Sequence, residues 1–114
     1  MPRFVVLTHD HPKLHWDFML EHEGVLRTWR LAQPPDTQGA IGAEALPDHR
    51  LAYLGYEGPV SGDRGTVERW DSGHFEVMEW STSRLVARMS GTRLKGIASL
   101  DRADSVAAWA FHHA

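Results

Sequence analysis

The stretch from His9 to Glu21, H-D-H-P-K-L-H-W-D-F-M-L-E, constrains this chain most, because polar and apolar residues alternate along its second half. The side chains of a β-strand point alternately to its two faces. A strand from about Leu14 to Glu21 therefore has one apolar face, made of Trp16, Phe18 and Leu20. The opposite face presents His15 and Asp17 side by side, as two neighbouring metal-binding groups.

A third imidazole lies just before this strand. His9 and His11 precede Pro12, which disfavours a helix, so we expect a short loop that folds a histidine back over His15 and Asp17. Two imidazoles and a carboxylate suit a divalent transition metal held in an open, catalytic geometry. The spacing alone leaves a second interpretation open, in which some of the eight histidines are surface residues or hydrogen-bonding groups without a ligand role.

Composition limits the class of protein. The 114 residues suffice for one hydrophobic core, so we expect a single domain over residues 1–114. Hydrophobic residues make up 42% of the chain, which favours a packed globule over disorder. The absence of cysteine excludes disulfides, thiolate metal sites and cysteine nucleophiles.

Hydropathy and charge bear on location and partners. No apolar run approaches the length of a membrane span and the start does not resemble a signal peptide, so we expect a cytoplasmic protein without a membrane partner. The formal net charge of −3 argues against a broad electrostatic grip on nucleic acid. Basic residues in the C-terminal third could form a local strip that contacts the end of a nucleic-acid strand. The alternative is that they lie on a solvated face of a β-sheet.

Short strands separated by turns are expected along the rest of the chain. They are Arg3 to Leu7, Val25 to Leu31, Ala43 to Leu46, Thr66 to Trp70, His74 to Trp80, Leu85 to Met89 and Leu94 to Leu100. Asp71-Ser72-Gly73 predicts a hairpin turn. If residues 48–53 are extended, His49 and Tyr53 share one side and form a second polar pair at the site, although Tyr53 is equally well explained as a core aromatic. Many short strands with little helix indicate an all-β sandwich or barrel.

The run F-V-V-L-T-H-D-H-P-K-L-H-W-D-F-M-L-E-H-E-G-V-L-R-T-W resembles the opening of the 3′-phosphoesterase domain of bacterial DNA ligase D, a family that also includes small free-standing proteins. D-H-R-L-A-Y at 48–53, Y-E-G at 56–58, G-T-V-E-R-W-D at 65–71 and R-L-K-G at 93–96 follow in the family's order. The resemblance implies a compact all-β barrel with short strands and long loops, and a metal site in a surface groove.

The C-terminal segment has two interpretations. Alanine-rich composition favours a short helix capped by Asp104 or Ser105. The family resemblance implies a strand at this place, which Val106 to Phe111 can form, and we favour the strand.

The resemblance also implies an activity, in which a 3′-terminal ribonucleoside and then a 3′-phosphate are removed from a primer strand with manganese, so that the end is healed for DNA repair. His9, His15 and Asp17 match the family's metal ligands. His49 and Tyr53 match residues around the phosphate, with catalytic roles. Zinc and cobalt also suit these ligand types. The implied substrate is a DNA or RNA/DNA 3′ end, and a separately encoded DNA ligase or repair protein is a partner left open.

Three cationic positions of the family are lost here. Met19 stands where the family has arginine, Ile41 replaces an arginine eight residues before His49, and Gln33 lies in a segment that loses a lysine. Arg30 and Arg50 are the candidates to contact phosphate instead. If the weakened anion clamp limits turnover, restoring arginine at position 19 is expected to raise it.

These losses leave two principal functions open. The first is a metal-dependent phosphoesterase, which the presence of His49 and Tyr53 favours. The second is a weakened or inactive metal-binding module that docks nucleic acid or a repair partner, which the lost cations favour. A phosphoesterase of small molecules is a third, weaker possibility.

Overall fold

The computed structural model describes residues 1–103 and 106–114. It contains nine β-strands and one turn of 3₁₀ helix, η1. The elements are β1 (Arg3–His9), β2 (His15–His22), β3 (Val25–Leu31), β4 (Ile41–His49), η1 (Leu51–Leu54), β5 (Gly58–Pro59), β6 (Thr66–Trp80), β7 (Arg84–Gly91), β8 (Lys95–Ala103) and β9 (Val106–His113). Among the described residues, the only helix is therefore too short to cross a membrane.

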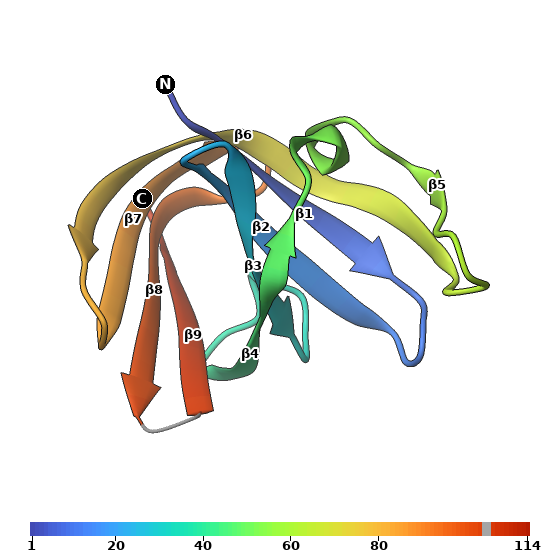
Figure 1. Ribbon diagram of the computed structural model, residues 1–114. Coiled ribbons are helices and arrows are strands. Elements are labelled where there is room, and N and C mark those ends of the chain that lie inside the picture. Colours follow the sequence, from blue (N-terminus) through green and yellow to red (C-terminus); the bar gives the residue numbers. More distant parts are fainter. Residues whose placement is uncertain (104–105) are drawn as a thin grey trace.

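The strands form one antiparallel sheet that closes on itself. Their order is β1-β2-β3-β4-β9-β8-β7-β6-β5, and β1 pairs with β6 as well as with β2. This second pairing joins the two ends of the series, so eight strands form a ring and β5 lies outside it (Figure 1). The predicted compact all-β barrel with little helix is therefore confirmed. Closure of the ring removes the unpaired edges of the sheet.

Apolar side chains are buried on both faces of the β1–β4 part of the sheet. The larger cluster fills the barrel and contains Phe18, Leu20, Trp29 and Trp109, with Trp16 packed against it. The smaller cluster lies on the opposite face and contains Val5, Leu7, Met19, Leu26 and Val67. The prediction that Phe18 and Leu20 anchor β2 in the interior is confirmed. The face with His15 and Asp17 is covered as well, so both faces of β2 are buried.

The predicted hairpin turn at Asp71-Ser72-Gly73 is wrong. These residues lie in the middle of β6, a single strand of 15 residues that pairs with β1 over its first part and with β7 over its second. The Asp71 side chain is buried and accepts hydrogen bonds from the backbone N–H groups of Ser72, Thr92, Arg93 and Leu94. Its turn-forming chemistry therefore serves the β7–β8 turn, which is remote in sequence.

Two smaller differences and one confirmed prediction concern element bounds. The strand predicted from Ala43 to Leu46 extends over the whole of β4 and ends at His49. The extended conformation considered for residues 48–53 is wrong, because Leu51–Leu54 forms η1. The C-terminal segment forms β9, as favoured, and the proposed helix caps Asp104 and Ser105 lie outside the described residues.

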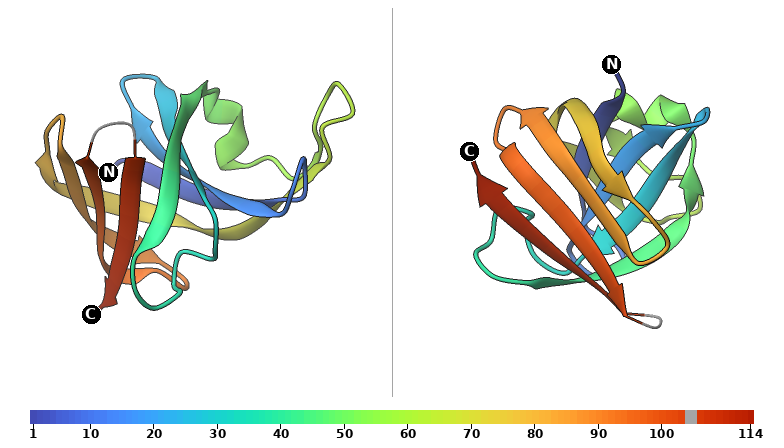
Figure 2. Two further views of the ribbon diagram at one scale, coloured as in Figure 1. Left: turned by 90° about the horizontal axis from the view of Figure 1, so that it is seen from below. Right: turned by 90° about the vertical axis from the view of Figure 1, so that its left-hand side faces the viewer.

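The hairpin of β2 and β3 is confirmed together with its turn. Glu23 and Gly24 have φ angles of 51° and 82°. Two consecutive residues with positive φ are typical of the tight hairpin turns that match the twist of the flanking strands. The turn sets the register in which Asp17 on β2 lies opposite Arg30 on β3. The views in Figure 2 show this hairpin beside β1 on one wall of the barrel.

Candidate metal centre

Strand pairing brings two histidines together at one end of the β1–β2 hairpin. His9 is the last residue of β1 and lies directly opposite His15, the first residue of β2. We expected a loop to carry the third imidazole, but His9 belongs to the strand itself. Residues directly opposite each other on antiparallel strands have neighbouring side chains on one face. The two imidazole centroids are accordingly 4.8 Å apart.

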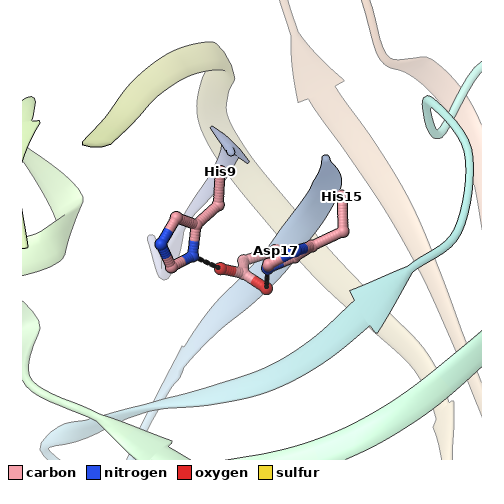
Figure 3. A group of neighbouring side chains, drawn as sticks. All are labelled: His9, His15 and Asp17. Carbon is pink, nitrogen blue, oxygen red and sulfur yellow. Dashed lines mark hydrogen bonds and ion pairs between the residues drawn. The ribbon is translucent and has the colours of Figure 1, made fainter. Parts of the chain in front are cut away.

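The Asp17 carboxylate lies between the two imidazoles (Figure 3). Its Oδ2 is 3.3 Å from Nδ1 of His9, and its Oδ1 is 3.1 Å from Nε2 of His15. Potential ligand atoms of the three residues all lie within 4.8 Å of one another. His15 and Asp17 are only 5% and 3% exposed, whereas His9 is partly exposed. Among the described residues, this is the only such group of three or more potential metal ligands.

Backbone carbonyls determine which nitrogen of each imidazole carries the proton. The other nitrogen, which has the lone pair, faces the Asp17 carboxylate. Nε2 of His9 is 2.8 Å from the Arg64 carbonyl, and Nδ1 of His15 is 2.8 Å from the Lys13 carbonyl. A carbonyl oxygen only accepts, so the nitrogen next to it carries the proton. In the neutral rings, the lone pairs are then on His9 Nδ1 and His15 Nε2, the two atoms next to Asp17. This arrangement is typical of metal-binding histidines.

Two buried atoms of this group lack a hydrogen-bond partner. Nε2 of His15 and Oδ1 of Asp17 are close enough for a hydrogen bond, but their geometry does not satisfy one, so both are unpartnered. Burying such atoms without a partner costs about 1–3 kcal/mol each. A divalent cation between the three side chains would accept a lone pair from each of these atoms. The donor set and the unpartnered atoms therefore fit a bound cation.

The electrostatics of the site favour positive charge. Burial lowers the pKa of His15, but the contact with Asp17 and the Lys13 carbonyl raise it by more, so its pKa lies above the usual 6.5. The charge of Arg30 acts in the opposite direction. A buried carboxylate beside an imidazole thus stabilises a cation at this place, whether a proton or a metal ion.

The turn before β6 completes the surroundings of His9, which the sequence pattern did not predict. Oδ1 of Asp10 accepts a hydrogen bond from the Thr66 N–H at 2.8 Å. Gly65 has a φ of +76°, and a Cβ placed on it would clash with Oδ1 of Asp10. Glycine is therefore needed for the turn to approach His9 closely enough to present the Arg64 carbonyl. Asp10 next to His9 was the only local signal in the sequence.

Arg30 lies beside the three candidate ligands. It is the cross-strand partner of Asp17, on the same face of the sheet. Together with His15 it lines a cleft of about 650 Å³, and Glu44 forms a loose ion pair with it at 3.6 Å. The Arg30 Nε atom is buried without a hydrogen-bond partner. The Arg30 side chain is 38% exposed, so its guanidinium is available to an anion that enters the cleft.

His49 and Tyr53 are neighbours, although they lie in different elements. His49 ends β4 and Tyr53 lies in η1, and their rings are 5.6 Å apart in an edge-to-face arrangement. Tyr53 packs against the smaller cluster, which contains Met19, two residues beyond Asp17 on β2. This contact places η1 on the same side of the sheet as the candidate ligands. Nδ1 of His49 donates to the Pro47 carbonyl at 2.9 Å, which leaves Nε2 free.

The positions of the three lost cations have different environments. Met19 is only 1% exposed and belongs to the smaller cluster. Ile41 is buried in the larger cluster at the opposite end of β4 from His49, so its side chain does not face the cleft. Gln33 is exposed in the loop between β3 and β4. Arg50, proposed as a replacement, is exposed and lines a cleft with Tyr53, away from Arg30.

Comparison with known proteins identifies a family and several relatives. The family profile described as "DNA Ligase D 3'-phosphoesterase domain" matches residues 7–102. The multifunctional non-homologous end joining DNA repair protein LigD of Mycobacterium tuberculosis is 32% identical over 108 residues, covering 87% of this chain and 14% of that protein. The LigD proteins of Pseudomonas aeruginosa and Mycolicibacterium smegmatis are 36% and 33% identical, over 68% and 66% of this chain.

The chain thus spans about a seventh or less of the length of these relatives. The match nevertheless covers most of its strands and contains every candidate ligand. This chain therefore belongs to the DNA ligase D 3′-phosphoesterase domain family.

Proposed function

We propose that this protein is a metal-dependent phosphoesterase that acts on the 3′ end of a nucleic-acid strand. The observation that carries the proposal is the convergence of His9, His15 and Asp17 with two buried unpartnered atoms. Membership of the DNA ligase D 3′-phosphoesterase domain family supports the choice of substrate. The names of the relatives, which describe end joining and DNA repair, support a role in processing broken ends.

His9, His15 and Asp17 would hold the ion, with Mn²⁺ as the first choice and Zn²⁺ or Co²⁺ as alternatives for the same ligand types. When bound, such an ion supplies polarisation of a phosphate oxygen and a lower pKa for bound water. The carbonyls of Arg64 and Lys13 keep the two imidazoles in the tautomer that directs a lone pair toward the ion.

The remaining roles fall to residues on either side of the ligands. Arg30 takes non-bridging phosphate oxygens in the cleft, exchanging the loose pair with Glu44 for a charge-assisted contact. His49 has a free Nε2, which can hold a proton for the leaving oxygen. Tyr53, held against His49 and the smaller cluster, orients the substrate through its phenol.

A second function is favoured by the burial of Met19 in an apolar cluster, where the resemblance implied an anion-binding arginine. With this position unavailable to phosphate, the domain would bind metal and dock nucleic acid or a repair partner without catalysis. Hydrolysis distinguishes the two functions, because both can use Arg30 to contact a phosphate but only the first releases a product.

The decisive experiment is hydrolysis of a primer–template that bears a 3′-phosphate or a single 3′-ribonucleotide, with MnCl₂ and purified protein. We expect metal-dependent product from the wild type, loss with His15→Ala, and a raised KM with Arg30→Gln. His112→Ala is the matched control, because His112 is an exposed histidine on β9.

If high enzyme concentrations yield no product that depends on the metal, the phosphoesterase is excluded. Calorimetry with MnCl₂ then tests the non-catalytic module, which should still bind one ion. His15→Ala should abolish that binding.

A further inference from the structure

A small cleft lies beyond Tyr53, on the side of η1. It has a volume of about 210 Å³ and is lined by Arg50, Ala52, Tyr53, Tyr56, Pro59, Val60 and Ser61. This is smaller than the 300–1,000 Å³ typical of sites for drug-sized ligands, so it suits a single ring system rather than a whole nucleotide.

The cleft is physically connected to the candidate metal centre through two segments. Tyr53 forms part of its wall and also contacts the His49 ring. On the opposite wall, Val60 donates a hydrogen bond to the Gly65 carbonyl and Ser61 accepts one from Arg64. The carbonyl of that same Arg64 contacts His9. Contacts between protein residues thus link the walls of the cleft to His9 and His49.

Tyr56 is fixed in place at this cleft. Its hydroxyl donates a hydrogen bond to the Pro59 carbonyl, and its phenol end lies over Gly58. Its ring meets that of Tyr53 edge to face, with centroids 5.8 Å apart and an interplanar angle of 86°. Tyr56 nevertheless remains 37% exposed. An aromatic ring that is both rigid and exposed offers a stacking surface at little cost in side-chain entropy.

Arg50 adds a planar cation to the same cleft. It is exposed, and no ion pair within the described part of the chain involves it. A guanidinium can stack on a heteroaromatic ring or donate to its polar edge. Aromatic rings beside a planar cation are the combination with which proteins bind the bases of single strands.

We infer that Tyr56 and Arg50 form a nucleobase subsite that takes the base of the 3′-terminal nucleotide. The inference rests on the proposed function for its orientation, since the phosphate of that nucleotide then lies at the metal centre. It predicts that the protein recognises a strand end whose last base is unstacked from its duplex, because a paired and stacked base cannot enter the cleft.

The test is binding of short single-stranded 3′-phosphorylated oligonucleotides in the presence of a chelator, measured by fluorescence anisotropy. One oligonucleotide has an ordinary terminal nucleotide, and the other has an abasic terminal sugar. We expect the wild type to bind the first at least about fivefold more tightly, the lower range for one base–aromatic stack. In Tyr56→Leu this ratio falls to about one, whereas Tyr56→Phe keeps it.

Met78→Ala is the matched control, because Met78 is an exposed apolar residue near the end of β6 that does not pair with β5. The ratio compares two ligands on one protein, so a change in stability does not imitate the effect. The subsite is overturned if the wild type does not distinguish the oligonucleotides, if it binds neither, or if Tyr56→Leu keeps the ratio. Failure of metal-dependent hydrolysis would not change this readout, because binding is measured without metal.

Discussion

At the scale of single residues, the surroundings of Asp17 decide the chemistry of the site. The carboxylate is buried, carries an unpartnered oxygen and lies between two imidazoles whose lone pairs face it. Such an arrangement is unfavourable for folding until a cation is bound. Side chains kept in an unfavourable environment are typical of functional sites, where stability is exchanged for activity.

Asp17→Asn tests this exchange. The amide N–H of asparagine can donate to Nε2 of His15, which now lies 3.1 Å from a carboxylate oxygen. We expect the free energy of unfolding of the metal-free variant to exceed that of the wild type by about 1 kcal/mol, because two unpartnered atoms are replaced by a hydrogen bond. We also expect Mn²⁺ affinity to fall at least about tenfold. Thermal unfolding and calorimetry measure the two effects. A clearly less stable metal-free variant would contradict the unfavourable environment of Asp17, and an unchanged Mn²⁺ affinity would contradict its role as a ligand.

Met19→Arg has a different expected outcome once the structure is considered. The resemblance alone suggested higher turnover, but Met19 is only 1% exposed and lies in the apolar cluster that supports η1. An uncompensated charge in such a place costs about 3–5 kcal/mol. We therefore expect a lower melting temperature, with Met19→Leu close to the wild type. An unchanged melting temperature together with faster turnover would show that the guanidinium reaches the phosphate after all.

At the scale of elements, β6 organises the two halves of the barrel. Its first part pairs with β1, which carries His9, and its second part pairs with β7. Asp71 lies where the strand changes partners and holds the β7–β8 turn by three of its four backbone hydrogen bonds. A carboxylate that accepts hydrogen bonds from so many backbone N–H groups acts as the cap of the β7–β8 turn.

Asp71→Ala should therefore destabilise the fold without disturbing the metal centre. Backbone donors at the β7–β8 turn lose their buried acceptor, and we expect a loss of about 3 kcal/mol or more in the free energy of unfolding. Chemical denaturation measures it. Asp101→Ala is the matched control, because Asp101 is an exposed carboxylate paired with Arg84 and should change stability by less than about 1 kcal/mol. Equal effects of the two substitutions would refute the role of Asp71.

At the scale of the whole molecule, the candidate metal centre lies where the barrel closes. Its ligands come from the end of β1 and the start of β2, and the turn that leads into β6 contacts His9. The pairing of β1 with β6 completes the ring. An ion held by this arrangement binds the native state in preference to the unfolded chain, so its binding energy becomes stability of the native state.

Mn²⁺ should accordingly raise the melting temperature, and a chelator should reverse the rise. An ion at one hundred times its dissociation constant adds about 2.7 kcal/mol to the free energy of unfolding. Differential scanning fluorimetry across a MnCl₂ titration measures the shift, with His15→Ala as the variant that should show none. A shift of equal size in both proteins would place the bound ion elsewhere.

Local patterns were sufficient for much of this protein. Alternation along residues 14–21 and the glycine turn at 22–24 predicted the β2–β3 hairpin, and the spacing of His15 and Asp17 placed both side chains on one face. These features depend on the period of a strand and on turn chemistry, which act over a few residues. Periodicity alone did not distinguish a β-barrel from a β-sandwich, whereas the family motifs predicted the barrel.

Tertiary structure alone decided the remaining features, because they depend on residues far apart in the chain. Asp71-Ser72-Gly73 has turn-forming residues, but pairing of β6 with both β1 and β7 outweighs that local preference. The Arg64 carbonyl on His9 and the burial of Met19 beneath η1 likewise arise from contacts between distant segments. Local chemistry determines which groups can bind a cation, whereas the closed sheet determines which of them meet and which are buried.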